Sequence, residues 1–452
     1  YTGGRERIAY RLSGSFDQRD SFELSDDFEQ DTNQTSQERT NSDYRRENLF
    51  GYLQTTSETF GRTSIFYNLS NNERGLAPEV GVDDADFERL AESNRRTIGL
   101  SNQFESVPLS VKLFHNHYDS ELEVYTDNTY STLDETEDAE ENTYGAMAYY
   151  SMTAGEDHVL VFGLSGINEH YESEGALENF DDATLRTYSL AAEDHFSLGP
   201  VSFVAGAMFS RFEQPEEDRS LSAFNPQITM DWRATENLTV HGSAAQRTRF
   251  PKLRELYQRR RGNPNLNEQV ANNYQVGLLY QHSSGWSADL TAFRSDIDDL
   301  IERPDRRSSY ENLSEVTFEG FEATASWGSE RLFSRLSYTY LDAAEELPNG
   351  AERQIRSRAK HSVHGEVRVK LDYGINFALN GIYSDGLHDL DGDENYITLP
   401  DYLVLQLKAS KTFGDNLEGY VSVSNVTDEN YVHRLGYPRP GREVRLGVSV
   451  EI

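Results

Sequence analysis

The strongest constraint on this chain is an alternation of apolar and polar residues that recurs along its whole length. In the last run, Val444, Leu446 and Val448 share one parity, and Arg445 and Gly447 share the other. A period of two residues predicts strands with one apolar and one polar face. We count about 20 such runs, with boundaries good to a few residues. The chain is therefore predicted to be all-β.

The connections between these runs alternate strictly in length. Short turns, such as 154–156, 198–199 and 283–285, alternate with polar insertions at roughly 17–43, 70–95, 119–141, 167–183, 213–222, 247–271, 294–316, 342–359, 384–401 and 425–441. Tight turns on one rim and long loops on the other are typical of a large transmembrane antiparallel up-and-down β-barrel. A soluble sandwich does not separate its connections this way, and a propeller would show a blade repeat of about 40–50 residues. We predict that residues 1–452 form a single transmembrane β-barrel domain.

The composition agrees with a barrel. Hydrophobic residues make up only 36% of the chain, and no apolar run approaches the roughly 18 residues that a membrane helix needs. A barrel strand needs only about 10 alternating residues, half of them polar. A helical membrane protein is therefore excluded. The absence of Cys excludes disulfides and thiolate metal sites.

The charge and the motifs exclude further function classes. The formal net charge of −35 argues against nucleic acid as a partner, because phosphates would be repelled. Acidity of this size usually keeps a surface hydrated and proteins apart. The sequence holds no G-x-S-x-G, H-E-x-x-H or Gly-rich phosphate motif in a suitable context. We therefore expect that the protein is not an enzyme.

Three motifs in the second half of the chain occur in a recognisable order. They are TRFPKLRELYQRRRGNPNLNEQVANNYQVGL at 248–278, YENLSEVTFEGFEA at 310–323 and NVTDENYVHRLGYPRPGR at 425–442. Together they resemble the barrel of TonB-dependent outer-membrane receptors. Thr248 stands where the first family pattern begins with Phe. The first half of the chain matches the family only by the rhythm of its strands.

The resemblance implies a fold and a set of partners. Members of the family have 22 strands and an N-terminal plug domain, preceded by a segment that the TonB energy-transducing complex reads. By this comparison the run 7–16 is expected to correspond to the third strand, and the chain looks like a barrel without its plug and first two strands. The last strand is expected to close on an N-terminal strand. The implied function is active uptake of a scarce nutrient across the bacterial outer membrane, with outer-membrane lipid, TonB and a small-molecule ligand as partners.

Long loops commonly carry function, and several here are rich in arginine. Because Arg pairs bidentately with carboxylates, these loops predict an anionic ligand such as a ferric siderophore. Cobalamin or another organic nutrient is the alternative ligand class. A haem ligand would need a histidine such as His282, His388 or His433. The candidate ligand-binding residues are Arg259, Arg260, Arg261, Arg303, Arg306, Arg307 and Arg356.

Two rival functions stay open on the sequence alone. A passive porin-like channel would have the same strands, with loops folded into an open lumen. A soluble acidic β-protein used for adhesion or scaffolding would also alternate. Detergent-free solubility would favour the soluble protein, and heat-modifiable migration on a gel would exclude it.

One acidic loop has the spacing of a calcium site. Its carboxylates alternate around a glycine at a turn, as they do in calcium-binding loops. Pro400 stands where an EF-hand would have its bidentate Glu, so an EF-hand is excluded. We keep a calcium site of another kind and a merely solvated loop as alternatives, and expect no other cofactor. The candidate ligands are Asp389, Asp391, Asp393 and Glu394.

Overall fold

The computed structural model describes residues 2–5, 7–175, 182–258, 261–304, 308–347, 350–391, 395–414 and 416–451. Nearly all regular structure in these ranges is β-strand, with one short helix, α1 (Leu253–Tyr257), and two 3-10 turns, η1 (Pro215–Glu217) and η2 (Asp372–Gly374). Among the described residues, no helix is long and apolar enough to cross a membrane.

The strands follow the chain in order. They are β1 (Thr2–Arg5), β2 (Ile8–Arg19), β3 (Tyr44–Ser57), β4 (Gly61–Leu76), β5 (Glu88–Gln103), β6 (Leu109–Tyr125), β7 (Leu133–Ala154), β8 (His158–Gly175), β9 (Asp182–Leu198), β10 (Val201–Gln214), β11 (Arg219–Arg233), β12 (Leu238–Arg249), β13 (Gln269–Gln281), β14 (Trp286–Glu302), β15 (Glu311–Gly328), β16 (Leu332–Glu346), β17 (Glu352–Gln354), β18 (His361–Lys370), β19 (Ile375–Asp385), β20 (His388–Leu390), β21 (Tyr396–Thr398), β22 (Tyr402–Phe413), β23 (Leu417–Ser424) and β24 (Glu443–Val450).

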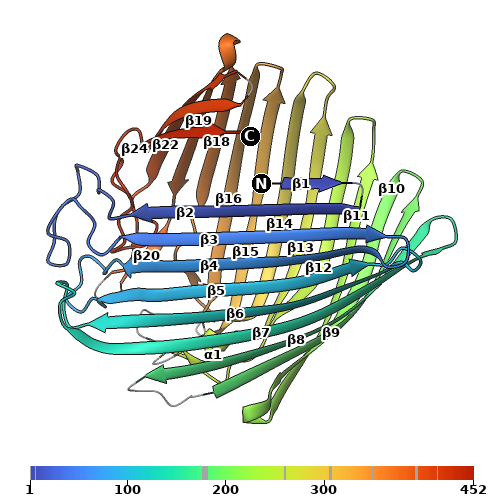
Figure 1. The fold of residues 1–452 in the computed structure, drawn as a ribbon, viewed down its shortest axis with the longest axis horizontal. Coiled ribbons are helices and arrows are strands. Elements are labelled where there is room, and N and C mark those ends of the chain that lie inside the picture. The colour runs from blue at the N-terminus through green and yellow to red at the C-terminus, as the bar shows by residue number, and fades with distance from the viewer. Residues whose placement is uncertain are drawn as a thin grey trace.

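In the described part of the chain, 22 of these strands form one antiparallel sheet, and β20 and β21 form a separate small hairpin. The sheet curves round on itself, so that β2 to β8 lie across the interior from β12 to β16 (Figure 1). This confirms the predicted all-β fold class. The alternation predicted every long strand, and the unpredicted ones, β1, β17, β20 and β21, have only three or four residues.

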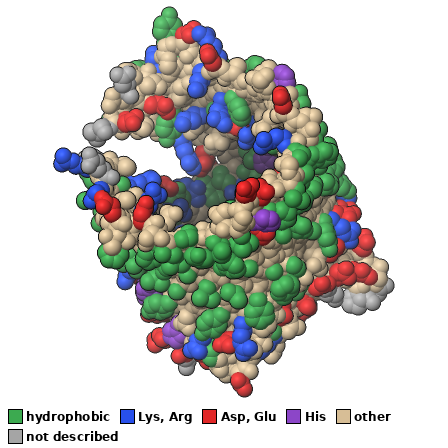
Figure 2. Space-filling model, turned by 90° about the vertical axis from the view of Figure 1, so that its right-hand side faces the viewer, with side chains coloured by type: hydrophobic (Ala, Val, Ile, Leu, Met, Phe, Trp, Pro, Cys, Tyr) green, Lys and Arg blue, Asp and Glu red, His purple; other side chains and the backbone are tan. Residues whose placement is uncertain are grey.

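Alternation along each strand separates two faces of the sheet. Leu164 of β8 is 60% exposed and pairs directly with Leu190 of β9, which is also 60% exposed, so both point to the same outer face. Figure 2 shows a band of hydrophobic side chains on the outside and blue Lys and Arg side chains around a hollow. Monomeric soluble proteins rarely expose a continuous apolar band of this extent. An outward-facing apolar band is expected of a barrel surrounded by lipid.

The two ends of the sheet meet through loops. Among the described pairings, β24 pairs only with β23 and β1 only with β2, so the expected pairing of the last strand with an N-terminal strand is not seen. Instead, the first and last long loops contact each other. The amide of Gly441 donates to the carbonyl of Glu23 at 2.9 Å, and the Ser25 hydroxyl donates to the carbonyl of Asp428 at 2.6 Å. We call these contacts between residues 20–43 and 425–442 the loop seam.

Several predicted loops are shorter than the sequence indicated. The acidic stretch 119–141 is largely strand, because β6 continues to Tyr125 and β7 begins at Leu133. The insertions 167–183, 213–222 and 294–316 are likewise mostly strand extensions. The reason is physical: where both faces of a strand meet water, both carry polar residues, and the alternation that marks a strand is lost.

Candidate ligand-binding site

The described parts of the loop between β12 and β13, residues 250–258 and 261–268, are fixed against the strand ends. Leu253 and Leu256 of α1 are buried in one cluster with Leu185 of β9. The Arg249 guanidinium donates hydrogen bonds of 2.8 and 2.7 Å to the two carboxylate oxygens of Glu255. This loop therefore gives a firm base for the residues that follow it.

Four arginines from four connections lie near one another, and we call Arg261, Arg303, Arg356 and Arg434 the arginine cluster. The Arg356 Nη2 donates to the backbone carbonyl of Arg303 at 2.8 Å. The backbone amide of Tyr310 donates to the carbonyl of Arg261 at 2.8 Å. The Arg303 guanidinium lies 5.8 Å from the centre of the Tyr310 ring. These contacts hold the first three arginines of the cluster together.

The last long loop carries the fourth arginine to the same place. The amide of Ser357 donates to the carbonyl of His388, the first residue of the β20–β21 hairpin, at 2.9 Å. The amide of Leu435 donates to the Asp389 carboxylate of that hairpin at 2.8 Å. The hairpin therefore joins the segment after β17 to the loop of Arg434.

The cluster is a concentration of positive charge in an otherwise acidic chain. Burial lowers the pKa of Arg303, and the charges of Arg261, Arg434 and Arg356 lower it further, while Tyr310 opposes them. A guanidinium nevertheless stays protonated at neutral pH. Repulsion among like charges is relieved when an anion lies between them, and the planar fork of Arg suits carboxylates and similar oxygen anions. The arrangement is suited to an anionic ligand.

The family follows from a comparison with known proteins. A family model described as TonB dependent receptor-like, beta-barrel matches residues 2–426. The chain belongs to this family. Members of the family are receptors and transporters. The three sequence motifs of this chain had predicted an outer-membrane barrel of this family.

Two curated relatives of this receptor barrel are transport and virulence proteins. This chain is 26% identical to the vitamin B12 transporter BtuB of Photobacterium profundum over 285 residues. The matched region covers 60% of the chain and 46% of BtuB. The chain is 25% identical over 332 residues to an iron-regulated outer membrane virulence protein of Vibrio cholerae, covering 65% of the chain and 49% of that protein. The chain thus spans about half the length of the curated relatives it matches.

Solved structures share the fold of the receptor barrel. The copper transporter OprC matches with a TM-score of 0.82 at 14% identity, covering 99% of this chain and 77% of OprC. The FrpB iron transporter from Neisseria meningitidis (F5-1 variant) also reaches 0.82, at 15% identity, covering 99% and 79%. The siderophore receptor PirA from Acinetobacter baumannii reaches 0.75 at 12% identity, covering 98% and 75%.

The structure brings part of the predicted arginine set together. Of the predicted ligand-binding residues, Arg261, Arg303 and Arg356 lie in the arginine cluster. Arg434 was missed, because all the candidate arginines were drawn from other long loops. Its signal was available, since the loop belongs to the long-loop rim. Four further candidates lie outside the described residues: Arg259, Arg260, Arg306 and Arg307.

The predicted calcium site is described only in part, because Asp393 and Glu394 lie outside the described residues. The buried Asp389 carboxylate accepts hydrogen bonds from the amides of Leu390 and Leu435 at 2.9 and 2.8 Å. In the described ranges, no group of three or more acidic or histidine side chains is placed to hold a metal. Calcium binding stays a prediction, which titration calorimetry with calcium tests.

The histidines considered for haem lie on both rims of the barrel. His282 lies in the short turn between β13 and β14, where its ring hydrogen-bonds the Ser284 hydroxyl at 2.6 Å, so it stands on the rim opposite the long loops. His388 and His433 lie on the loop side, and His433 packs against the rings of Tyr402 and Tyr431 at 5.6 and 5.5 Å. The two histidines on the loop side lie in segments that the hydrogen bond between Leu435 and Asp389 joins.

Proposed function

We propose that this chain is the transport barrel of a TonB-dependent outer-membrane receptor that takes up an anionic ferric siderophore. The observation that carries the proposal is the arginine cluster on the long-loop rim. A ferric siderophore offers several oxygen anions on one rigid surface, which matches four guanidinium groups from separate loops.

The relatives support a role in uptake, but they differ in the ligand they are named for. The ligand class is therefore inferred from the arginine cluster. Their names include vitamin B12, iron, copper and siderophore. Cobalamin is the second candidate, because one curated relative is a vitamin B12 transporter. It presents amide groups rather than a set of oxygen anions, so the arginine cluster favours the siderophore.

In this proposal, the barrel acts as a wall and gate. Ligand binds on the long-loop side, and energy from the TonB complex drives its passage through the lumen. The barrel does no covalent chemistry. A passive porin-like channel would instead conduct ions without an energy source.

A binding panel tests the substrate class. Full-length protein in detergent is titrated with anionic ferric siderophores of the carboxylate and catecholate types, with a neutral ferric siderophore, and with cyanocobalamin. The proposal predicts saturable binding of at least one anionic complex, and weaker binding of the neutral one. Saturable binding of cyanocobalamin alone would favour the second candidate, and ion conductance in planar bilayers without ligand binding would favour the porin.

A further inference from the structure

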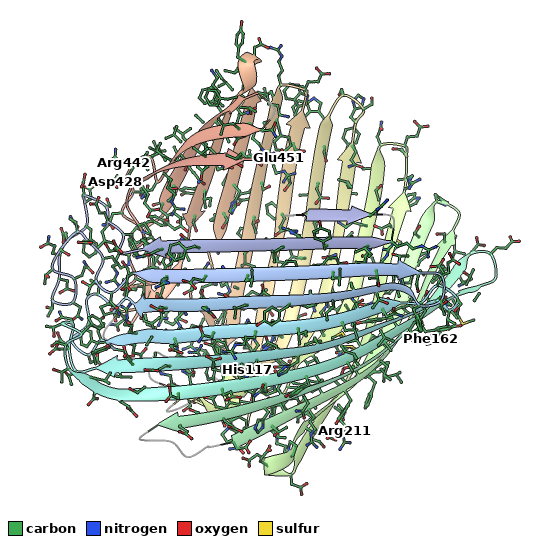
Figure 3. All side chains as sticks on the ribbon, in the orientation of Figure 1. His117, Phe162, Arg211, Asp428, Arg442 and Glu451 are labelled. Carbon is green, nitrogen blue, oxygen red and sulfur yellow. The ribbon has the colours of Figure 1, made fainter. Side chains whose placement is uncertain are left out.

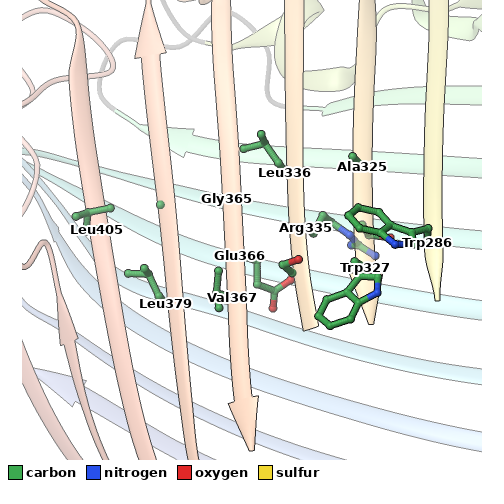
Figure 4. Close-up of a pocket in the computed structure, with 13 residues that line it drawn as sticks. Trp286, Ala325, Trp327, Arg335, Leu336, Gly365, Glu366, Val367, Leu379 and Leu405 are labelled. Atoms are coloured by element: carbon green, nitrogen blue, oxygen red, sulfur yellow. The ribbon is translucent and has the colours of Figure 1, made fainter. Parts of the chain in front are cut away.

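The outer face of the barrel holds a hollow that the transport function does not use. Its cavity volume is about 450 Å³, within the usual range of small-molecule sites. Figure 4 shows its lining spread across neighbouring strands, from Trp286 and Trp327 at one end to Leu405 at the other. We call it the wall groove.

The wall groove lies on the outward, apolar face. Leu336 of β16 pairs directly with Gly365 of β18, and Gly365 pairs with Gly381 of β19, so the three share one face. Leu336 is 56% exposed, like other residues of the outer band. Arg335 pairs with Glu366, and both have the parity opposite to that of Leu336 and Gly365. The two residues therefore belong to the lumen side. The outward side chains of the groove are therefore almost all apolar.

Two adjacent glycines make the hollow, and the backbone does not require them. Neither Gly365 nor Gly381 is among the glycines with positive φ. A Cβ added at Gly365 would meet only a Leu336 methyl carbon, at 4.0 Å, so a side chain has room there. Glycine inside a strand lowers stability relative to Ala. The glycines that leave the hollow open therefore lower the stability of the fold.

The direction of the groove indicates what fills it. Trp286 is the first residue of β14, beside the short-turn rim, and Trp327 pairs with it. Tryptophans at this level mark the boundary between lipid headgroups and hydrocarbon. From there the lining passes to Leu405, near the loop-side start of β22 (Tyr402–Phe413). The groove therefore runs from the headgroup level into the hydrocarbon region.

We propose that the wall groove binds one acyl chain of a phospholipid from the leaflet on the short-turn side. This inference rests on the membrane placement in the proposed function. Within hydrocarbon there is no hydrophobic driving force, so selectivity comes from van der Waals packing, and a flexible chain gains contacts on three sides of a slot. A second barrel would present a convex surface, whereas a stable protein interface needs about 800 Å² of complementary surface from each partner.

The three tryptophans of the chain give the test. Trp286 and Trp327 line the groove, and Trp232, which is 43% exposed near the end of β11, is a reference on the same rim. The 452-residue chain is reconstituted in phosphatidylethanolamine vesicles containing an increasing fraction of phosphatidylethanolamine brominated in its acyl chains, which quenches indole fluorescence. Trp232→Phe isolates the groove pair, and Trp286→Phe with Trp327→Phe isolates the reference.

The decisive variant fills the slot. Gly365→Leu, made in the Trp232→Phe background, is expected to raise the brominated fraction that gives half-quenching about threefold. Gly51→Leu is the matched control, since Gly51 has the outward parity of β3 and open space at its Cβ, and lies outside the wall groove. Gly365→Ala serves if the larger variant loses heat-modifiable folding.

Each outcome is decisive. A shift in the Gly365 variants but not in Gly51→Leu supports the acyl-chain site. Equal shifts, or none, would overturn it, as would a dimer in the wild-type protein that Gly365→Leu dissociates. Failure of the membrane placement gives a different result, because neither the groove pair nor Trp232 would then be quenched at any brominated fraction.

Discussion

Arginine chemistry is central to the ligand recognition that we propose for this barrel. Arg303 lies centrally in the arginine cluster, stacked near Tyr310 and bonded through its carbonyl to Arg356. Lysine keeps the charge but loses the planar fork that binds two oxygens at once. We therefore predict that Arg303→Lys weakens binding of an anionic ferric siderophore about tenfold, and Arg303→Gln by more. Equal affinity of Arg303→Lys and the wild type, measured by fluorescence titration, would show that the fork is not used.

His433 makes the last loop sensitive to acid. Burial, with help from Arg439, lowers the pKa of His433 in the folded protein. The unfolded loop, with a histidine pKa of about 6.5, takes up a proton that the folded loop resists, so loop stability is lost as the pH falls below that value and is unaffected above it. We predict faster amide exchange at 431–435, relative to intrinsic rates, when the pH drops from about 7.5 to 5.5. In His433→Gln this change should disappear, and its persistence would assign the acid sensitivity to another group.

Among the elements, the loop seam takes the place of strand pairing between the ends of the sheet. The Asp428 carboxylate accepts hydrogen bonds from the amide of Asp26 at 3.0 Å and from the amide of Arg442 at 2.7 Å, and Figure 3 shows Asp428 and Arg442 together on the loop rim. A Cβ at Gly441 would come within 2.7 Å of the Leu24 carbonyl oxygen, so the two loops are in close contact.

Removing the Asp428 carboxylate should open this seam. Asp428→Ala leaves two amides without their acceptor, and because both hydrogen bonds are exposed, water takes its place and the loss is about 0.5–1.5 kcal/mol for each bond. We expect proteolysis within 20–43 to become at least about tenfold faster under conditions where cleavage follows the open population. Glu429→Ala is the matched control, because it removes the same charge from the next residue. Equal cleavage of both variants would mean that the carboxylate does not hold the seam.

The elements also show where prediction from sequence succeeds. Each long strand was predicted. One face of such a strand meets an apolar medium and the other does not, so apolar and polar residues alternate along its sequence. The prediction weakened above the apolar band, in 119–141, where β6 and β7 continue with polar residues on both faces. Three members of the arginine cluster were predicted in separate loops and Arg434 was missed, since the assembly of the cluster depends on tertiary contacts such as that between Leu435 and Asp389. The wall groove was not predicted, because two glycines in different strands carry no signal of being neighbours.

On the scale of the whole molecule, the apolar outside defines the environment. Leu164 of β8 faces outward with 60% of its surface exposed, and Ser165 has the opposite parity. We predict that Leu164→Arg lowers the free energy of unfolding in bilayers by about 2–4 kcal/mol, because its charge would lie near the middle of the hydrocarbon. Ser165→Arg, which points to the lumen, should change it much less. Similar effects of the two variants would contradict the assignment of faces.

The net charge of the whole molecule also affects how an anionic ligand is captured. A net charge of −35 repels anions at long range, yet at about 0.1 M salt this repulsion is screened beyond roughly 10 Å. The arginine cluster acts within that distance. The acidity of the chain and an anionic ligand are therefore compatible.

The most direct measurement of the central claim is equilibrium binding of an anionic ferric siderophore to full-length protein in which Arg303, Arg356 and Arg434 are all changed to Gln. Arg331→Gln is the matched control, since Arg331 pairs with Asp372 at 2.9 Å in the turns of the opposite rim. The account predicts that the triple variant loses at least about a hundredfold in affinity, from the charged contacts of three arginines, while Arg331→Gln binds as the wild type does. Wild-type affinity in the folded triple variant would contradict it.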